Sequence, residues 1–236
     1  GFIQQVQQEV EDKTGLNIFE DSLQIHTTLD PKAQEHVEFL LSDDEENPIN
    51  YSSDPEMQVG LTVVDTQTGA IRAVGPGRNR DSNGWNYAIH GDGRQPGSTI
   101  KPLTVYGPAV EHMKMSTYHQ LLDDKPYPIK GSDGLVIRNA GRNYSGWVTA
   151  REALTRSLNV PTVKLMEEVG FQNAKDFAKG LGLSFHEDSL TIGDAIGGTA
   201  STATPLEMAG AYAAFGNGGV YHEPYAVTKI EYPNGR

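Results

Sequence analysis

The sequence predicts an α+β fold in which a cluster of helices accompanies antiparallel strands. The first observation is a strand–turn–strand pattern. Residues 59–64 alternate between larger and smaller side chains, residues 65–69 carry turn chemistry, and residues 70–74 return as a second strand. The second observation is a pair of helix starts at Thr149 and Thr204, each followed three residues later by glutamate, which is the pattern of a capping box.

Size and composition limit the function classes. A chain of 236 residues can bury an ordinary core without staples. The absence of cysteine excludes a disulfide scaffold, a thiolate metal site and a cysteine nucleophile. The formal charge of -12 argues against a nucleic-acid partner, which calls for a basic footprint. No stretch approaches 18 apolar residues, so no membrane-spanning segment is predicted among these residues.

The first sixty residues predict two helices and a loop. Apolar residues at helical spacing predict a helix from Phe2 to near Gly15. Asp30 followed by Pro31 supplies an N-cap and a first-turn proline for a second helix, which runs to Leu41. Residues 42–56 are acidic and contain proline, which predicts an exposed loop.

Later elements follow the same signals. A helical stretch begins at about Ser98, and Pro108 is expected to kink it or to start a new segment after Gly107. Further helices are expected over residues 149–156, 161–170, 174–181 and 205–216. Residues 225–232 predict a strand whose partner is expected to be absent from the chain. Trp85 and Trp147 are expected to pack in the core rather than to line a cleft.

Ser98 and Lys101 form the first candidate site. Residues three apart on a helix are neighbours, and a desolvated lysine can act as the base that a serine nucleophile needs. The first turn of a helix adds free backbone N–H groups, and Gly97 just before it lets a substrate approach the backbone closely. A Ser-x-x-Lys pair alone is not specific, because a serine at a helix start with an exposed lysine has the same pattern.

Ser157 and Asn159 form the second candidate. Val160 precedes Pro161 and is expected to leave the helical region, so both residues are expected on an extended loop. At i and i+2 in such a loop they point the same way. A hydroxyl can relay a proton, and a carboxamide can pair with a peptide backbone. The alternative is that Asn159 is only the N-cap of the helix that opens at Pro161.

The two motifs together resemble the penicillin-binding proteins and serine β-lactamases, a family signature of Ser-x-x-Lys and Ser-x-Asn. The match to class A, Gram-positive-like penicillin-binding proteins is wider than the motifs and covers most of the chain. The similar segments are residues 25–31, 61–74, 94–102, 151–161 and 204–212. The resemblance implies a serine β-lactamase/transpeptidase-like fold, with a helical cluster and an antiparallel sheet covered by helices.

The resemblance also implies a D,D-transpeptidase that cross-links peptidoglycan stem peptides and is the target of β-lactams. Ser98 would form the acyl-enzyme, Lys101 would take its proton and Ser157 would pass a proton to the departing amine. Asn159 and Gly97 would contact the substrate, and no metal or cofactor is implied. A D,D-carboxypeptidase, a β-lactamase, and a β-lactam-sensing or peptidoglycan-binding module without turnover remain alternatives. A class A β-lactamase would need a Glu-x-x-Leu-Asn loop after Asn159, and the chain contains none.

One departure from the family pattern concerns completeness. The third motif, Lys-Thr/Ser-Gly, is expected well after the second motif, and no such triplet follows Asn159; the one in the sequence, Lys13-Thr14-Gly15, precedes both motifs. We therefore expect residues 1–57 to be an interdomain linker region with the start of the transpeptidase domain. Residues 58–236 are then its N-terminal and central part without the third-motif strand, so the fold is incomplete at the C-terminus. The implied whole protein carries a glycosyltransferase half and an N-terminal membrane anchor, and it works at the extracytoplasmic face of the cell membrane.

Overall fold

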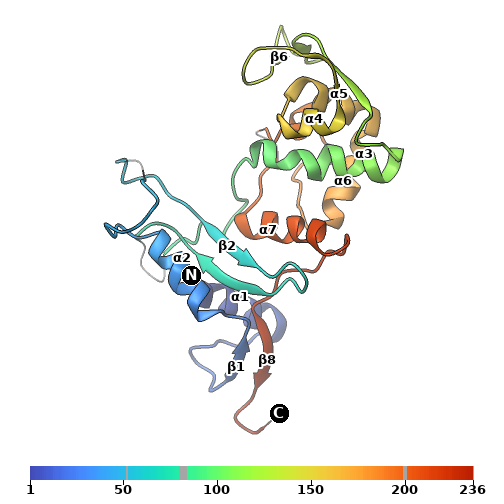
Figure 1. The fold of residues 1–236 in the computed structure, drawn as a ribbon. Helices are drawn as coiled ribbons and strands as arrows, with labels where there is room; N and C mark the ends of the chain where they lie inside the picture. The colour runs from blue at the N-terminus through green and yellow to red at the C-terminus, as the bar shows by residue number, and fades with distance from the viewer. Residues whose placement is uncertain (52, 80–83, 199–200, 236) are drawn as a thin grey trace. The chain divides into compact units, whose positions relative to one another are not determined.

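The chain divides into two units (Figure 1). The computed structural model describes residues 1–51, 53–79, 84–198 and 201–235. Unit 1 comprises Gly1–Gly93 and Thr204–Arg236, and unit 2 comprises Arg94–Ala203. Each unit is described by itself below. No helix in the described part of the chain combines the length and the apolar character that a membrane crossing requires.

The predicted hairpin lies in unit 1. Strands β2 (Leu61–Val64) and β3 (Ile71–Gly75) pair in antiparallel register. The carboxylate of Asp65 closes the turn by accepting the backbone N–H groups of Gln67 and Thr68, each at 3.0 Å. This Asx-type contact is why the aspartate suits the first turn position.

The two predicted N-terminal helices both pack against strand β3 of this hairpin. Helix α1 (Phe2–Thr14) ends at Gly15 in the left-handed conformation, and α2 (Pro31–Leu40) begins after Asp30, whose side chain caps two backbone N–H groups. Helix α2 packs against β3 through Val37, which is buried with Leu41 and Ala73. A second cluster joins Phe2, Val6 and Val10 of α1 to Ile71 and Val74 of β3.

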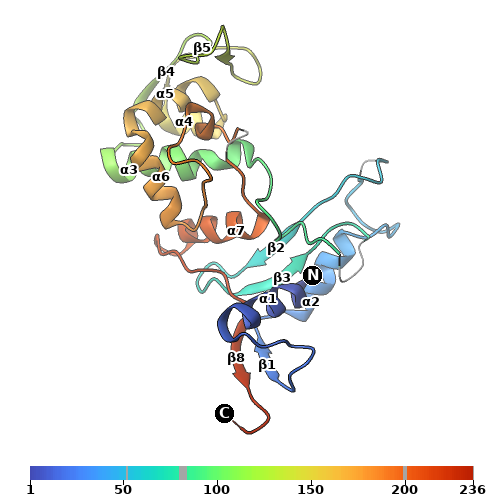
Figure 2. The ribbon, with the colours of Figure 1, turned by 180° about the vertical axis from the view of Figure 1, so that it is seen from behind.

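The C-terminal strand has a partner within the chain, although not the hairpin strand that was expected to follow residues 233–235. Strand β8 (Val227–Glu231) pairs antiparallel with β1 (Gln24–Thr27), a segment far away in the sequence (Figure 2). The buried carboxylate of Glu9 on α1 accepts the backbone N–H groups of Ala226 and Val227 at 2.8 and 3.1 Å. The four-residue β1 has one half-buried and three exposed positions, so its sequence lacks the pattern that marks a strand.

Helix α7 (Pro205–Ala213) packs against β2 and continues into the short turn η4 (Ala214–Gly216). Thr204 and Glu207 form both halves of the predicted capping box, with distances of 3.1 Å in each direction. The sequence signal therefore identified both the start and the end of this helix.

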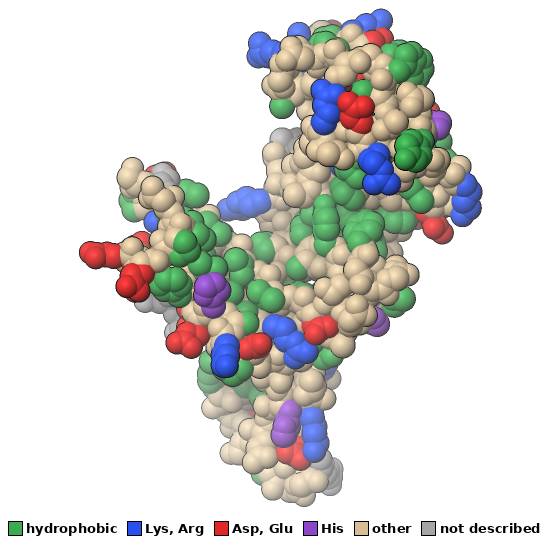
Figure 3. All heavy atoms as spheres, in the orientation of Figure 1, with side chains coloured by type: hydrophobic (Ala, Val, Ile, Leu, Met, Phe, Trp, Pro, Cys, Tyr) green, Lys and Arg blue, Asp and Glu red, His purple; other side chains and the backbone are tan. Residues whose placement is uncertain are grey.

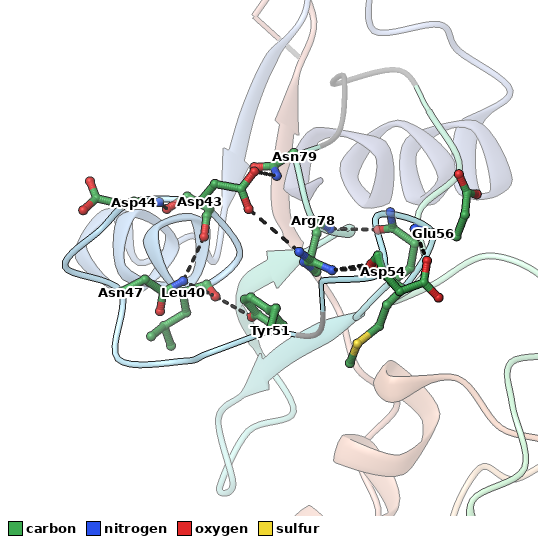
Figure 4. A network of polar contacts seen from close by, with 12 residues as sticks. Leu40, Asp43, Asp44, Asn47, Tyr51, Asp54, Glu56, Arg78 and Asn79 are labelled. Atoms are coloured by element: carbon green, nitrogen blue, oxygen red, sulfur yellow. Dashed lines mark hydrogen bonds and ion pairs between the residues drawn. The ribbon is translucent and has the colours of Figure 1, made fainter.

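A polar network holds the acidic loop that follows α2 (Figure 4). The guanidinium of Arg78 lies 4.5 Å from the centre of the Tyr51 ring and donates to the carbonyl oxygen of Met57 at 3.0 Å. It also forms an ion pair with Asp43 at 3.8 Å, and Asn79 donates to the same carboxylate. The partly buried Arg78 side chain, together with Asn79, thus attaches the loop to the rest of unit 1. On the face drawn in Figure 3, the Lys and Arg side chains of the described residues are scattered, and several lie beside Asp or Glu side chains.

Unit 2 contains two small strand pairs and most of the helices. Strand β4 (Gln120–Asp123) pairs with β7 (Gly146–Thr149), and β5 (Tyr127–Pro128) pairs with β6 (Val136–Ile137), both antiparallel. Trp147 on β7 is 66% exposed, and Trp85 in unit 1 is 52% exposed. The expectation that these tryptophans pack in the core is therefore wrong.

The helices of unit 2 are α3 (Gly107–Met113), α4 (Ala150–Thr155), α5 (Asn159–Val169) and α6 (Phe171–Gly180). Their core includes Val105, Val163, Leu165 and Met166, all fully buried. Only half of the capping box predicted at Thr149 forms: its hydroxyl accepts the N–H of Glu152 at 3.1 Å. The Glu152 carboxylate pairs instead with Arg156 at 2.8 Å.

Candidate active site

Ser98 lies in a tight turn, and a wider turn follows it. The 3₁₀ turn η1 (Gly97–Ile100) carries Ser98 with its side chain exposed, and Gly97 adopts a left-handed φ of 58°. A π-helical turn, η2 (Pro102–Tyr106), comes next, and α3 begins at Gly107. Pro108 lacks an N–H and its ring clashes with the preceding turn, which explains the change of helical register there. The new segment expected after Gly107 does not form, because the chain stays helical from Lys101 to Met113; only the hydrogen-bonding pattern changes, just before Pro108.

Lys101 is completely buried in unit 2, between η1 and η2. Its Nζ donates to three neutral oxygens: the Ser157 carbonyl at 2.8 Å, the Ser157 Oγ at 2.9 Å and the Asn159 Oδ1 at 2.8 Å. An ammonium has three protons, so its hydrogen-bonding capacity is filled without a carboxylate. Burial lowers the pKa of Lys101 to about 8. At pH 7 roughly 10% of such a group is neutral, and only this form can accept a proton.

Ser157 takes an unusual backbone conformation. Its φ is 53°, in the left-handed region that glycine favours. The N–H of Ser157 bonds to Leu154 at 3.0 Å and the N–H of Leu158 bonds to Ala153 at 2.9 Å. These two bonds form a Schellman ending of α4, in which the left-handed position is usually glycine. The strained serine turns both its hydroxyl and its carbonyl oxygen toward Lys101.

Asn159 is the first residue of α5, not part of an extended loop as expected. Val160 is helical too, although it precedes Pro161. The reason is a side chain from elsewhere: Asn139 Oδ1 accepts the N–H groups of Asn159 and Val160, each at 3.0 Å. The alternative that Asn159 is the N-cap is also wrong, because Leu158 occupies that position.

The structure thus places Lys101, Ser157 and Asn159 in direct contact, whereas Ser98 stands apart. Among the described residues, no hydrogen bond joins the Ser98 hydroxyl to the Lys101 amine, whose three donors all point to the second motif. Catalytic contacts are often loose in a free enzyme and tighten only when substrate binds. The assigned roles of Ser98, Lys101, Ser157, Asn159 and Gly97 therefore stay predictions.

A close backbone approach supports the turn before Ser98. A Cβ atom on Gly197 would overlap the backbone of Gly97, and Gly197 has a φ of 71°. The turn just before Gly197 is fixed by the buried carboxylate of Asp194. This carboxylate accepts hydrogen bonds from the backbone N–H of Thr191 at 2.7 Å and from the hydroxyl of Ser201. The sequence analysis missed this loop, although its pair of adjacent glycines is a signal of close approach.

Comparison with known proteins identifies this arrangement. Residues 59–235 match the family described as the penicillin binding protein transpeptidase domain. The chain is 43% identical over 236 residues to penicillin-binding protein 1A/1B of Bacillus subtilis (strain 168), a match that covers 99% of this chain and 25% of the relative. It is 34% identical over 243 residues to penicillin-binding protein 1A of Streptococcus pneumoniae (strain ATCC BAA-255 / R6), with 99% and 33% coverage.

Solved structures agree. The penicillin-binding protein PonA1 from Mycobacterium tuberculosis superposes with a TM-score of 0.81 at 27% identity, covering 100% of this chain and 61% of that one. The same protein has been solved in complex with penicillin V, with the same TM-score. Penicillin-binding protein 1A from Haemophilus influenzae shares the fold, with a TM-score of 0.75 at 20% identity; that match covers 100% of this chain and 48% of that one.

The chain belongs to the penicillin-binding protein transpeptidase family. Within that family it is a transpeptidase domain of the class A group, so the predicted family and the predicted α+β fold are both confirmed. The chain spans between a quarter and somewhat more than a third of the length of the first curated relatives it matches. The division into a linker over residues 1–57 and a transpeptidase part over residues 58–236 stays a prediction.

Proposed function

We propose that this chain carries the acylation centre of a D,D-transpeptidase that cross-links peptidoglycan stem peptides and is inhibited by β-lactams. The observation that carries the proposal is the buried Lys101, whose amine joins the Ser-x-x-Lys motif to the Ser-x-Asn motif through Ser157 and Asn159. A buried cation that meets only neutral acceptors is held close to its neutral form, as a general base requires.

The first half of the reaction forms an ester. The Ser98 Oγ attacks the carbonyl carbon between the two terminal D-alanines, and its proton passes to the neutral Lys101 amine. The C–N bond then breaks, the departing D-alanine amine receives a proton through the Ser157 hydroxyl, and the acyl group stays on Ser98. A β-lactam enters in the same way, except that its amine remains tethered and the ester persists.

The second half transfers the acyl group. An amine from a neighbouring stem peptide attacks the ester carbonyl, and Ser98 recovers its proton. The Asn159 carboxamide and the Gly97 backbone are proposed to hold the substrate backbone during both halves. No Lys-Thr/Ser-Gly triplet, which supplies an oxyanion donor in the family, follows the second motif in this chain; Lys13-Thr14-Gly15 lies at the C-terminal end of α1. Removing a single such donor costs ~10²–10³ in rate.

The proposal extends to the setting of the protein. The named relatives are class A penicillin-binding proteins, so we place the activity at the extracytoplasmic face of the cell membrane. There it would act together with a glycosyltransferase half and a membrane anchor of the same polypeptide. Its partners would be peptidoglycan stem peptides and β-lactam antibiotics, and no metal, cofactor or nucleic acid enters the scheme.

The test is labelling of the full polypeptide that carries residues 1–236 with a fluorescent penicillin, followed by mass mapping. We expect one label on Ser98, none in Ser98→Ala, and normal labelling in Ser189→Ala, a control at an exposed serine of the same unit. Labelling at another residue, or of the Ser98→Ala variant, would contradict the assignment. Stable acylation without transfer to an added D-amino acid would instead favour a sensing module.

A further inference from the structure

Two buried polar side chains of unit 2 lie behind the second motif and have no role in the scheme above. Asn139 follows β6 and is 4% exposed, and Asp123 ends β4 and is fully buried. The Asn139 Nδ2 donates to the Asp123 carboxylate at 2.7 Å and to the Asn143 carbonyl oxygen at 2.9 Å. The second Asp123 oxygen accepts the N–H of Ser145 at 3.0 Å.

The Asn139 carboxamide is fully used. Its Oδ1 accepts the first two N–H groups of α5, those of Asn159 and Val160, and its Nδ2 uses both protons. Helix α5 has no capping side chain of its own, because Leu158 precedes it. A residue about twenty positions earlier in the chain therefore does the work of an N-cap.

The partners of this carboxamide fix its orientation. The Asp123 carboxylate and the Asn143 carbonyl oxygen accept hydrogen bonds from its amino group, and two backbone N–H groups of α5 donate to its oxygen. Asp123 is the one side chain in this set. A neutral asparagine at position 123 can donate as well as accept, and it would weaken this part of the constraint.

The neighbouring backbone fixes the orientation of Asn159 in turn. The Arg138 carbonyl oxygen accepts the Asn159 Nδ2 at 2.9 Å, so the Asn159 Oδ1 is left to face Lys101. Residues 138 and 139 thus determine both where α5 begins and which end of the Asn159 amide meets the lysine.

We propose that Asn139, oriented by Asp123, is a positioning residue of the active site, holding Asn159 so that its Oδ1 supports the Lys101 amine. The proposal rests on the proposed function, because it concerns the same centre. Neither residue contacts Lys101 in the described structure, so both act through Asn159. A displacement of about 1 Å in such a group can cost ~10² in rate.

The main test compares Asn139→Ala and Asp123→Asn with wild type in the full polypeptide, using the second-order rate constant of acylation by a fluorescent penicillin. We expect this rate constant to fall ~10²-fold in Asn139→Ala, because Asn159 is then displaced. It should fall less in Asp123→Asn, because the Asn139 amide is still present and is only less firmly oriented. The matched control is Asn143→Ala, an exposed asparagine of the same segment whose backbone carbonyl, not its side chain, serves the network. It should acylate at the wild-type rate.

A second readout separates positioning from general instability. The Asn159 oxygen stabilises the charged form of Lys101, so its loss should lower the pKa of that amine below 8. The pH–rate profile should shift to lower pH in Asn139→Ala, and the Lys101 ¹³Cε resonance, assigned with Lys101→Arg, should titrate earlier. A folded Asn139→Ala or Asp123→Asn protein with the wild-type rate and titration would overturn the proposal.

The two proposals fail in different ways. If wild type is not acylated at Ser98, the proposed function fails, yet the Lys101 titration still reports whether Asn139 controls the amine. If wild type is acylated but neither variant changes rate or titration, only the positioning role fails. Should Asn139→Ala not fold, the nearly isosteric Asp123→Asn decides the matter alone.

Discussion

Ser157 offers a way to separate backbone strain from chemistry. It occupies a left-handed position with φ 53°, and its hydroxyl accepts a hydrogen bond from Lys101 at 2.9 Å. Ser157→Gly and Ser157→Ala both remove the hydroxyl, but only alanine retains the Cβ that the left-handed conformation disfavours. That penalty is about 1–2 kcal/mol, and the extra chain entropy of glycine offsets about 0.5–1 kcal/mol of it.

We therefore expect Ser157→Gly to be more stable than Ser157→Ala by about 1 kcal/mol, a difference of about 2–4 °C in Tm for a chain of this size. Urea and thermal unfolding followed by circular dichroism measure this difference. Acylation by a fluorescent penicillin should fall equally in both variants, because neither has the proton relay. An alanine variant as stable as the glycine variant would refute the assigned conformation. A glycine variant with wild-type acylation would refute the role of the hydroxyl.

Four further outcomes are expected. Gly197→Ala forces a Cβ into the backbone of Gly97 and should lower the acylation rate ~10²-fold; a rate near wild type would contradict the close approach. Because the neutral amine of Lys101 is the base, the acylation rate should rise tenfold per pH unit up to about pH 8 and then level off. Because the pKa of Lys101 is lower in the folded protein than in the unfolded chain, the unfolded chain binds this proton more tightly. The contribution of Lys101 to the free energy of unfolding should therefore rise with pH between about 8 and 10.5, which urea titration can measure. Glu9→Ala removes the acceptor of two backbone N–H groups at the start of β8, and it should lower the free energy of unfolding in urea by about 2–4 kcal/mol. Glu11→Ala, on the exposed side of α1, is the control and should leave this free energy unchanged.

Local signals in the sequence were sufficient where the structure is local. The hairpin around Asp65 and the helix starts at Asp30 and Thr204 depend on residues within a few positions of each other. Turn and capping chemistry is short-ranged, so a single sequence contains it. The motif residues Lys101, Ser157 and Asn159 could also be predicted to meet, but that prediction came from the family resemblance.

The errors arose where a distant group replaced a local rule. Val160 precedes a proline, which normally excludes the helical region, yet the Asn139 side chain pairs its N–H and the helix starts early. The partner of β8 is the short β1, two hundred residues earlier, and no alternation marks it as a strand. The positions of Asn139 and Asp123 follow from tertiary contacts, for which a single sequence has no local signal.

The full set of Lys101 contacts defines what must change before Ser98 can react. The ammonium uses its three protons on Ser157 and Asn159, and none is directed to Ser98 in the described structure. On losing a proton the amine keeps two donors and gains a lone pair, so one of the three contacts is given up unless the Ser157 hydroxyl reverses and donates to that lone pair. Deprotonation thus creates an acceptor for which the Ser98 and Ser157 hydroxyls compete.

This argument predicts a pH-dependent geometry. Structures determined at pH 6 and at pH 9, on either side of the Lys101 pKa of about 8, should differ at this amine. At pH 6 all three contacts should be present. At pH 9 one should lengthen beyond hydrogen-bonding range, and the Ser98 hydroxyl should turn toward Nζ. Lys101→Arg, which stays charged at both pH values, serves as the control and should show no such change. Three intact contacts in the wild-type protein at pH 9 would mean that substrate, not deprotonation, draws the lysine to Ser98.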